Sequence, residues 1–272
     1  MDPPIGPDAR AAFAAGGARP LHAYGRRVNS QNGEDGILHA ILCDIGVADV
    51  RRCVEMCAGT GAQSNTANLI LRHGFQGVLF DGDERNVRVC DHFFATMGCR
   101  ERAEPVCAWI TCENVAGLLR RHVPDPDVDV LSLDMDGVDW WVLREVLRSG
   151  ALRPRVIVLE YQDIVGPTEA LTVPYDPRFD GWAGDAEGGP NYCGASLAAF
   201  VHLLGKDYAF VGCEAAGFNG FFVRRSEMRE DALIGEMVDV APCFDAPKVR
   251  AGMATRWPRV RHLPWVDVRG LS

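Results

Sequence analysis

Short apolar runs alternate with amphipathic stretches over most of the chain. Five runs predict buried strands, at 53–57, 77–81, 106–110, 128–133 and 155–161. The stretches between them have apolar residues at helical spacing and predict helices at 65–73, 86–97, 115–122 and 140–148. Strands that alternate with helices in this way form a parallel sheet with helical crossovers, so we predict an α/β fold.

This alternation stops after residue 161. Residues 162–192 have no periodicity and many Pro, Gly and Asp residues. A loop of this length at the end of a central strand is typical of a lid over a ligand site, and its aromatic residues, such as Trp182, are candidates for the wall of that site. A helix is predicted at 196–204, followed by strands at 208–213 and 220–223. The turn between these strands is too short for a helix, so we expect them to be antiparallel.

The chain divides into three segments by composition. Residues 1–29 form an extension rich in Ala, Gly and Pro, and residues 241–272 form a tail rich in Pro, Arg and Trp. Residues 30–240 contain all the periodic elements, including a helix around 37–42 that is entered from a polar stretch. We therefore expect one main domain at 30–240, with the tail packed on or beside it.

Composition and charge narrow the function classes. Hydrophobic residues make up 47% of the 272 residues and charged residues 24%, which are globular values. The net charge of −9 disfavours nucleic acids and anionic membranes as partners. No apolar run approaches the length of a membrane span, and the N-terminus lacks signal-peptide features, so we expect a cytoplasmic protein. The ten cysteines are scattered without a Cys-x-x-Cys pair and are expected to be free thiols. The expected partners are a small-molecule substrate and a second copy of the chain.

A glycine turn follows the first predicted strand. Gly59 and Gly61 come after Glu55, in the strand–turn–helix arrangement that lets a backbone approach a ligand closely. A dinucleotide site would have a third glycine where this chain has Asn65, so a nucleoside ligand without phosphates fits better. Asp81 ends the next strand, about 20 residues on, where an acid can bind ribose hydroxyls. An ordinary strand–helix turn and a solvated Asp-Gly-Asp turn are the alternatives.

Five segments together resemble the FkbM-type methyltransferases, a branch of the class I S-adenosylmethionine-dependent enzymes. They are residues 30–36, 55–66, 131–137, 194–197 and 217–223. The resemblance implies a doubly wound, Rossmann-like sheet of seven mostly parallel strands with an antiparallel last strand, the class I methyltransferase fold. It also implies S-adenosylmethionine as cofactor and allows a role in natural-product biosynthesis. The chain departs from the usual pattern at Cys57, where glycine is common, and at Asp136, where many relatives have Glu.

The resemblance also implies which residues contact the cofactor. Glu55, Gly59 and Gly61 would border the methionine and ribose, and Asp81 would hold the ribose hydroxyls. Gln31 and Glu34 would close over the cofactor from the N-terminal side. The predicted cofactor residues are Gln31, Glu34, Glu55, Gly59, Thr60, Gly61, Asp81, Gly82 and Asp134.

Acidic residues follow the fourth and fifth predicted strands. Asp134, Asp136 and Asp139 follow the fourth, where they can contact substrate or cofactor, bind a divalent cation or cap the next helix. Glu160 and Asp163 flank Tyr161 at the end of the fifth. Parallel strands end at one edge of a sheet, so we expect these side chains to converge on the acceptor. The predicted catalytic residues are Asp134, Asp136, Glu160, Tyr161 and Asp163, and we predict no metal.

Several carboxylates in one pocket favour a positively charged occupant. We therefore expect the acceptor to be a nitrogen, an amine or guanidine of an amino-acid-like metabolite, with Glu160 taking its proton. A hydroxyl of a sugar or natural product is the main competitor. The Asp-x-Asp-Gly segment at 134–137 also resembles the nucleophile loop of haloacid-dehalogenase phosphatases, but that motif normally opens its domain. A catalytically silent partner that binds the cofactor is the remaining alternative.

Overall fold

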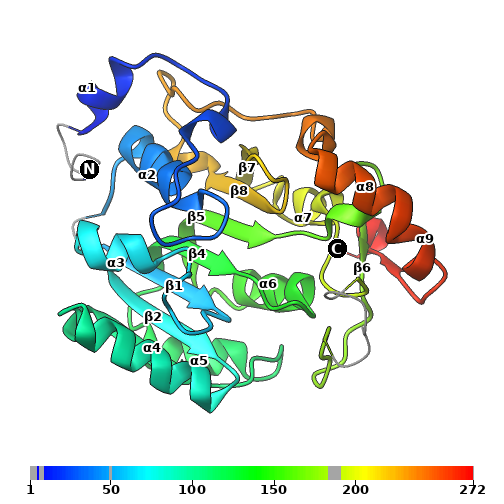
Figure 1. Cartoon of the computed structure of the whole chain (residues 1–272), viewed down its shortest axis with the longest axis horizontal. Helices are drawn as coiled ribbons and strands as arrows, with labels where there is room; N and C mark the ends of the chain where they lie inside the picture. The colour runs from blue at the N-terminus through cyan, green and yellow to red at the C-terminus, as the bar shows by residue number, and fades with distance from the viewer. Residues whose placement is uncertain (1–4, 6–8, 49–50, 183–190, 272) are drawn as a thin grey trace.

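A central sheet with helices on both faces organises the molecule (Figure 1). This computed structural model describes residues 5, 9–48, 51–182 and 191–271. The central sheet contains seven strands, which are β1 (Arg52–Met56), β2 (Gln76–Asp81), β3 (Ala103–Cys107), β4 (Asp127–Leu133), β5 (Arg153–Glu160), β7 (Tyr208–Cys213) and β8 (Asn219–Arg224). Their order across the sheet is β3-β2-β1-β4-β5-β8-β7.

The strand directions confirm the predicted α/β fold. Neighbouring strands among β1 to β5 are parallel to one another, and β8 runs antiparallel to both β5 and β7. Within this sheet, the strand that comes last along the chain, β8, is therefore the antiparallel one. The order reverses between β1 and β4, and the carboxyl ends of strands at such a switch point are where open α/β sheets bind ligands.

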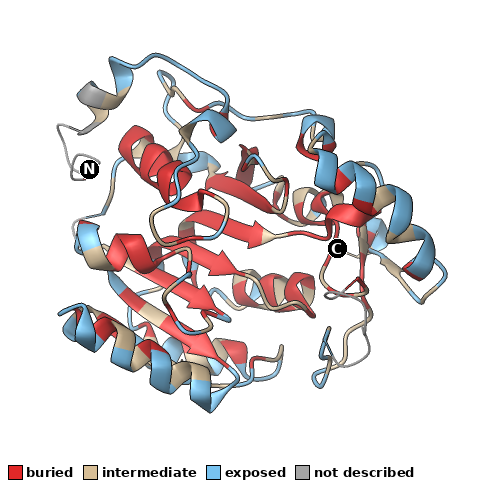
Figure 2. Cartoon of the chain, in the orientation of Figure 1, coloured by how far each residue is buried: buried red, intermediate tan, exposed pale blue. Residues whose placement is uncertain are grey.

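Figure 2 shows that the central strands consist mainly of buried residues, and their side chains enter a hydrophobic cluster on each face of the sheet. In β4, Val130 packs into one hydrophobic cluster and Leu131 into the other. In β5, Val156 and Ile157 divide in the same way. A strand covered on both faces has a continuous apolar sequence instead of an alternating one. This explains why apolar runs located these strands well.

Three helices cover each face of the sheet. The first cluster is covered by α5 (Val115–His122), α6 (Asp139–Arg148) and α7 (Leu197–Leu204). The second is covered by α2 (Glu34–Ile45), α3 (Ala67–His73) and α4 (Glu84–Thr96). Smaller helical elements are α1 (Ala9–Ala14), η1 (Leu21–Tyr24), η2 (Arg100–Arg102) and η4 (Arg225–Glu227). Among the described helices, none combines the length and apolar character that crossing a bilayer requires.

The third strand is a correction to the predicted boundaries. The apolar pattern indicated a strand at 106–110, whereas β3 spans Ala103–Cys107 and contains Pro105. β3 lies at the edge of the sheet and pairs only with β2. Proline is tolerated in an edge strand because one side of that strand makes no ladder hydrogen bonds.

The long loop and the tail are more ordered than their sequences indicate. The loop contains η3 (Asp163–Val165) and β6 (Leu171–Thr172), while residues 183–190 of the predicted lid lie outside the described residues. The tail forms η5 (Ala241–Phe244), α8 (Pro247–Thr255), α9 (Trp257–Val260), β9 (Val266–Asp267) and η6 (Val268–Gly270). β9 pairs antiparallel with β6, and α8 packs against η3. The tail is thus fastened to the loop that leaves β5.

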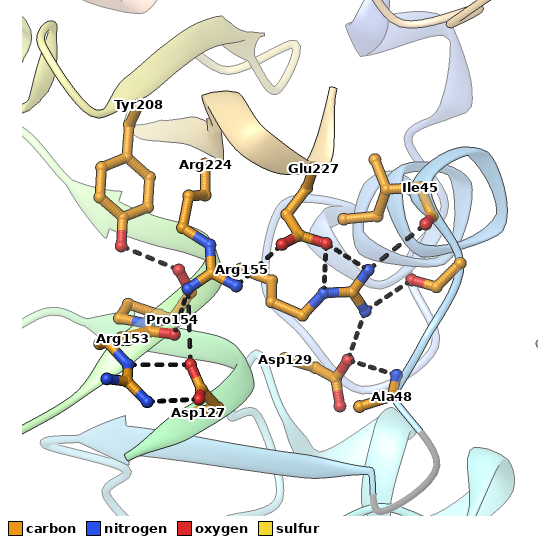
Figure 3. A network of polar contacts seen from close by, with 11 residues as sticks. Ile45, Ala48, Asp127, Asp129, Arg153, Pro154, Arg155, Tyr208, Arg224 and Glu227 are labelled. Atoms are coloured by element: carbon orange, nitrogen blue, oxygen red, sulfur yellow. Dashed lines mark hydrogen bonds and ion pairs between the residues drawn. The ribbon is translucent and has the colours of Figure 1, made fainter. Parts of the chain in front are cut away.

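A polar network joins the amino ends of β4 and β5 to the neighbouring segments (Figure 3). Arg155 of β5 forms ion pairs with Asp129 at 2.8 Å and with Glu227 at 2.8 Å. Its guanidinium also donates to the backbone carbonyls of Ile45 and Gly46 at the end of α2. Asp129 is fully buried, so this ion pair compensates a charge that would otherwise be costly. The network lies at the end of the sheet opposite the predicted site.

Candidate functional site

The turn after β1 has an unusual backbone. Cys57, Gly59 and Gly61 have φ angles of 64°, 56° and 76°. Left-handed backbone is accessible to glycine but strained for residues with a side chain. The positive φ at Cys57 gives the physical reason why glycine is common at this position of the resembling family.

The two glycines of this turn have different surroundings. A Cβ added at Gly59 would meet nothing within 4 Å, whereas one at Gly61 would lie 2.7 Å from the Cys90 sulfur and 3.0 Å from the ring of Phe94. Gly59 therefore leaves open space for a ligand. Gly61 instead allows α4 to pack against the turn. This packing explains why a glycine stands at position 61, which was predicted to contact the cofactor.

Asp81 holds the glycine turn in place. Its carboxylate accepts hydrogen bonds from the Gly59 amide at 2.8 Å, the Asp83 amide at 2.9 Å and the Asn86 side chain at 3.1 Å. Two carboxylate oxygens offer about four acceptor positions, so one remains for a ligand hydroxyl. Gly82 packs against Trp109, because a Cβ there would approach its ring to 2.9 Å.

Glu55 lies at the end of β1 and is almost completely buried. Its carboxylate accepts hydrogen bonds from the Asn65 amide at 2.9 Å and from the amide and hydroxyl of Thr66 at 2.8 and 2.5 Å. These contacts anchor the segment that leads into α3. Burial raises the pKa of Glu55, and the Thr66 hydrogen bonds oppose this shift.

The polar stretch before α2 reaches the same edge of the sheet. Glu34 accepts hydrogen bonds from the Asn32 amide at 2.8 Å and from the side chain of Asn219 at 2.9 Å. Asn219 lies opposite Glu160 in the pairing of β5 with β8. Sequence reasoning did not single out Asn219, although the segment 217–223 that contains it was part of the family resemblance.

A cavity of about 190 Å³ lies beside the glycine turn. Six of the nine predicted cofactor residues line it: Gln31, Glu34, Glu55, Gly59, Thr60 and Asp134. The other three predicted cofactor residues do not line it. Gly61 and Gly82 pack against neighbouring side chains, and Asp81 holds the turn.

Acidic side chains meet at the ends of β4 and β5, as predicted. Carboxylate oxygens of Asp134, Asp136 and Glu160 lie within 4.8 Å of one another, close enough to share one cation. Burial raises the pKa of Asp134 to about 7, and Asp136 adds to this shift. The pKa of Glu160 is also raised well above its usual range, first by burial and then by Asp134. Asp134 and Glu160, the acidic pair, therefore retain protons that ordinary carboxyl groups would lose.

The loop after β4 is fastened from both sides. Asp139 accepts hydrogen bonds from the amides of Met135 at 2.7 Å and Gly137 at 3.0 Å, so it braces this loop from the first residue of α6. Asp136 has a φ of 49° and accepts a hydrogen bond at 2.9 Å from the indole of Trp182. Burial raises the pKa of Asp136, and the Trp182 hydrogen bond opposes it. Trp182 thus brings the long loop over the acidic residues.

The structure gives Asp163 and Tyr161 environments that the sequence did not indicate. Asp163 forms an ion pair at 2.6 Å with Arg256, which follows α8 in the tail. The charge of Asp163 is therefore balanced within the protein, and its predicted catalytic role stays a prediction. Tyr161 is buried in the core with its ring 5.8 Å from that of Phe244. Burial raises the pKa of Tyr161.

A second cavity, of about 520 Å³, lies beyond the acidic pair. All five predicted catalytic residues line it, together with Trp182 and two basic residues of the tail, Lys248 and Arg256. Sequence reasoning missed these two residues. The two cavities share Gln31, Asn32, Asp134 and Glu160, so they meet at the acidic pair.

Comparisons with known proteins give remote similarities of structure. A scan against models of protein families and a search of curated proteins find no match to the sequence. A SAM-dependent methyltransferase from Thiobacillus denitrificans in complex with S-adenosyl-L-homocysteine is similar at 14% identity and a TM-score of 0.34, over 51% of this chain and 52% of that one. The chain thus spans about half the length of that methyltransferase.

Two further structures are similar over larger shares. A SAM-dependent methyltransferase from Aquifex aeolicus has 10% identity and a TM-score of 0.42, over 69% of this chain and 88% of that one. The [4+2]-cyclase SpnF has 13% identity and a TM-score of 0.41, over 74% and 67%. At these values the similarity does not assign a reaction to this chain.

Proposed function

We propose that this protein is an S-adenosylmethionine-dependent methyltransferase that transfers the methyl group to a nitrogen of a small molecule. The observation that carries this proposal is the meeting of two cavities at Asp134 and Glu160. A reaction between two bound molecules needs adjoining sites whose reacting atoms face each other. The smaller cavity would hold the cofactor and the larger one the acceptor.

The residues around the smaller cavity fit a nucleoside ligand. Gly59 leaves room for close approach. Asp81 does not line this cavity, but it holds the Gly59 turn and retains an acceptor position for a ribose hydroxyl. Glu34 and Asn219 provide polar groups on the opposite side. When bound, the cofactor supplies an electrophilic methyl group, so the chain's own residues need mainly to align the acceptor.

The acidic pair favours an acceptor that arrives as a cation. Two neighbouring carboxyl groups with raised pKa values are easily ionised only when a positive charge comes close. An ammonium or guanidinium group supplies that charge. The nitrogen must then lose a proton to become nucleophilic, and a carboxylate oxygen of Glu160 or Asp134 would hold it.

A proton count separates a nitrogen acceptor from a hydroxyl. Because the pKa values of the acidic pair are raised, an entering ammonium that ionises one carboxyl group would displace about one proton to solvent, whereas a neutral hydroxyl would displace none. Calorimetric titration with amines and with glycosides, in buffers of different ionisation enthalpy, measures this number. Proton release with amines supports the proposal, and methylation of glycosides only would contradict it.

Cofactor binding is the first experiment. Titration of the protein with S-adenosylhomocysteine should show binding, and Asp81→Ala should weaken it about 10- to 100-fold through lost hydrogen bonds. Asp83→Ala is the matched control, since the Asp83 side chain caps α4 through the Arg85 amide and does not hold the Gly59 turn. No binding by the intact protein would contradict the proposed function. Binding without turnover of any acceptor would favour a silent cofactor-binding partner.

The family and metal assignments belong to the same proposal. We assign the chain to the FkbM-type group on the five segments, with residues 30–240 as its methyltransferase domain. Turnover should survive EDTA, although Asp134, Asp136 and Glu160 are close enough to share a cation. Loss of activity with EDTA and its return with Mg²⁺ would make these residues metal ligands instead. The phosphatase alternative requires an ionised Asp134, which its raised pKa disfavours.

A further inference from the structure

The larger cavity has an acidic wall and a basic wall. The ends of β4 and β5 provide the acidic wall, with Asp134, Asp136 and Glu160. The tail provides the basic wall, with Lys248 in the first turn of α8 and Arg256 at its end. Figure 1 shows α8, in orange-red, on the side toward which β4 and β5 point. A ligand in this cavity therefore lies between carboxyl groups on one side and basic groups on the other.

Arg256 has a partner within the protein. Its guanidinium donates a hydrogen bond at 2.6 Å to the carboxylate of Asp163, a residue of η3. Arg256 is about one-third exposed and Asp163 is buried, so the pair joins the tail to the cavity floor. Because their charges cancel, this pair leaves no net charge for a ligand.

Lys248 is different. It is exposed, and its ammonium lies 4.7 Å from the centre of the Phe218 ring, which also lines the cavity. This cation–π contact holds the ammonium at the wall without neutralising it. Among the described residues, no carboxylate forms an ion pair with Lys248. One positive charge is therefore available beside the acidic wall.

We propose that Lys248 is a specificity-determining residue that binds a carboxylate of the acceptor, so that the acceptor is a zwitterion with a basic nitrogen and a carboxylate. This inference rests on the proposed function, because it describes the molecule that receives the methyl group. A single available lysine matches a single negative charge, which favours a carboxylate over a doubly charged phosphate. The acidic pair binds the nitrogen end, and Lys248 binds the other end.

Ligand pairs that differ only in the carboxylate test this inference. Calorimetry in the presence of S-adenosylhomocysteine would compare L-arginine with agmatine, L-lysine with cadaverine and L-phenylalanine with phenethylamine. In at least one pair the wild-type protein should bind the amino acid at least tenfold more tightly. Lys248→Gln should weaken the binding of that amino acid by about 10- to 100-fold and leave the binding of the corresponding amine unchanged. Arg250→Gln is the control, since Arg250 lies on the same helix and pairs with exposed Asp245.

Chemical labelling gives a readout that is independent of turnover. The chain contains two lysines, Lys206 and Lys248, and Lys206 does not line the cavity. A bound amino acid should slow acetylation of Lys248, measured by mass spectrometry, without changing the acetylation of Lys206. Equal binding within every pair, equal effects of Lys248→Gln on both members, or no protection by any amino acid would each overturn the inference. The proposed function would still stand if S-adenosylhomocysteine binds.

Discussion

The protons retained by the acidic pair have a measurable effect on stability. In the folded protein Asp134 and Glu160 have raised pKa values, whereas both groups ionise near pH 4 in the unfolded chain. A raised folded-state pKa stabilises the protein at low pH, and this stabilisation is lost as the pH rises toward the folded-state pKa. Replacing Glu160 by Gln removes one retained proton and leaves an amide that still donates toward Asp134.

The size of the effect follows from linkage. Each proton that the folded protein holds and the unfolded chain has released lowers the free energy of unfolding by about 1.4 kcal/mol per pH unit. Between pH 5 and pH 7, the free energy of unfolding should therefore decrease less in Glu160→Gln than in the wild-type protein. The difference is about 1.4 kcal/mol per pH unit, or roughly 2–3 kcal/mol over the interval. Other buried acids, such as Asp139, occur in both proteins, so their contributions cancel in the comparison.

Urea unfolding at several pH values between 5 and 7 measures these slopes. Glu101→Gln, a change at an exposed residue of η2, is the control and should leave the slope unchanged. Equal slopes in the wild-type protein and Glu160→Gln would show that Glu160 is ionised throughout this range. The proton-release test for a nitrogen acceptor would then lose its basis.

Five further substitutions test the fold and the glycine turn. Arg155→Ala should lower the free energy of unfolding by about 3–5 kcal/mol, because it leaves the buried Asp129 carboxylate without its ion pair (Figure 3). Arg153→Ala, which breaks an exposed ion pair, should cost at most about 1 kcal/mol. Similar losses in the two variants would contradict the role of the network. Gly61→Ala should destabilise the protein by more than about 2 kcal/mol through its clash with α4. Gly59→Ala should cost about 1 kcal/mol and weaken S-adenosylhomocysteine binding. Urea unfolding and calorimetry measure the two effects, and a larger loss of stability in Gly59→Ala would contradict this assignment. Cys57→Gly should raise the free energy of unfolding by up to about 1 kcal/mol by relieving its positive φ, and a lower melting temperature would contradict this.

The sequence predicted the central sheet well because its strands are buried on both faces. Apolar runs mark such strands directly, as in β4 and β5. The tail gave no comparable signal. Its helices α8 and α9 both have proline in their first turn, where the missing amide is tolerated. In a pattern of apolar positions, the same prolines indicate a break in structure instead of a helix start.

The site was predictable where it depends on strand ends. Asp134 and Glu160 meet because parallel neighbouring strands end at one edge, which the order of elements already indicates. The ion pair of Asp163 with Arg256 was not predictable, because it depends on how the tail folds back. Nor could the sequence distinguish Gly59, which faces open space, from Gly61, which packs against α4.

The tail contributes to one half of the site only. Lys248 and Arg256 line the larger cavity, whereas the wall of the smaller cavity comes from residues that precede the tail. Because β9 pairs with β6, the tail is fastened to the loop that carries Asp163 and Trp182. Changes in the tail should therefore alter acceptor binding while leaving cofactor binding intact. Under the proposed function, this division would let one cofactor site serve different acceptors, since Lys248 and Arg256 belong to a segment that folds outside the central sheet.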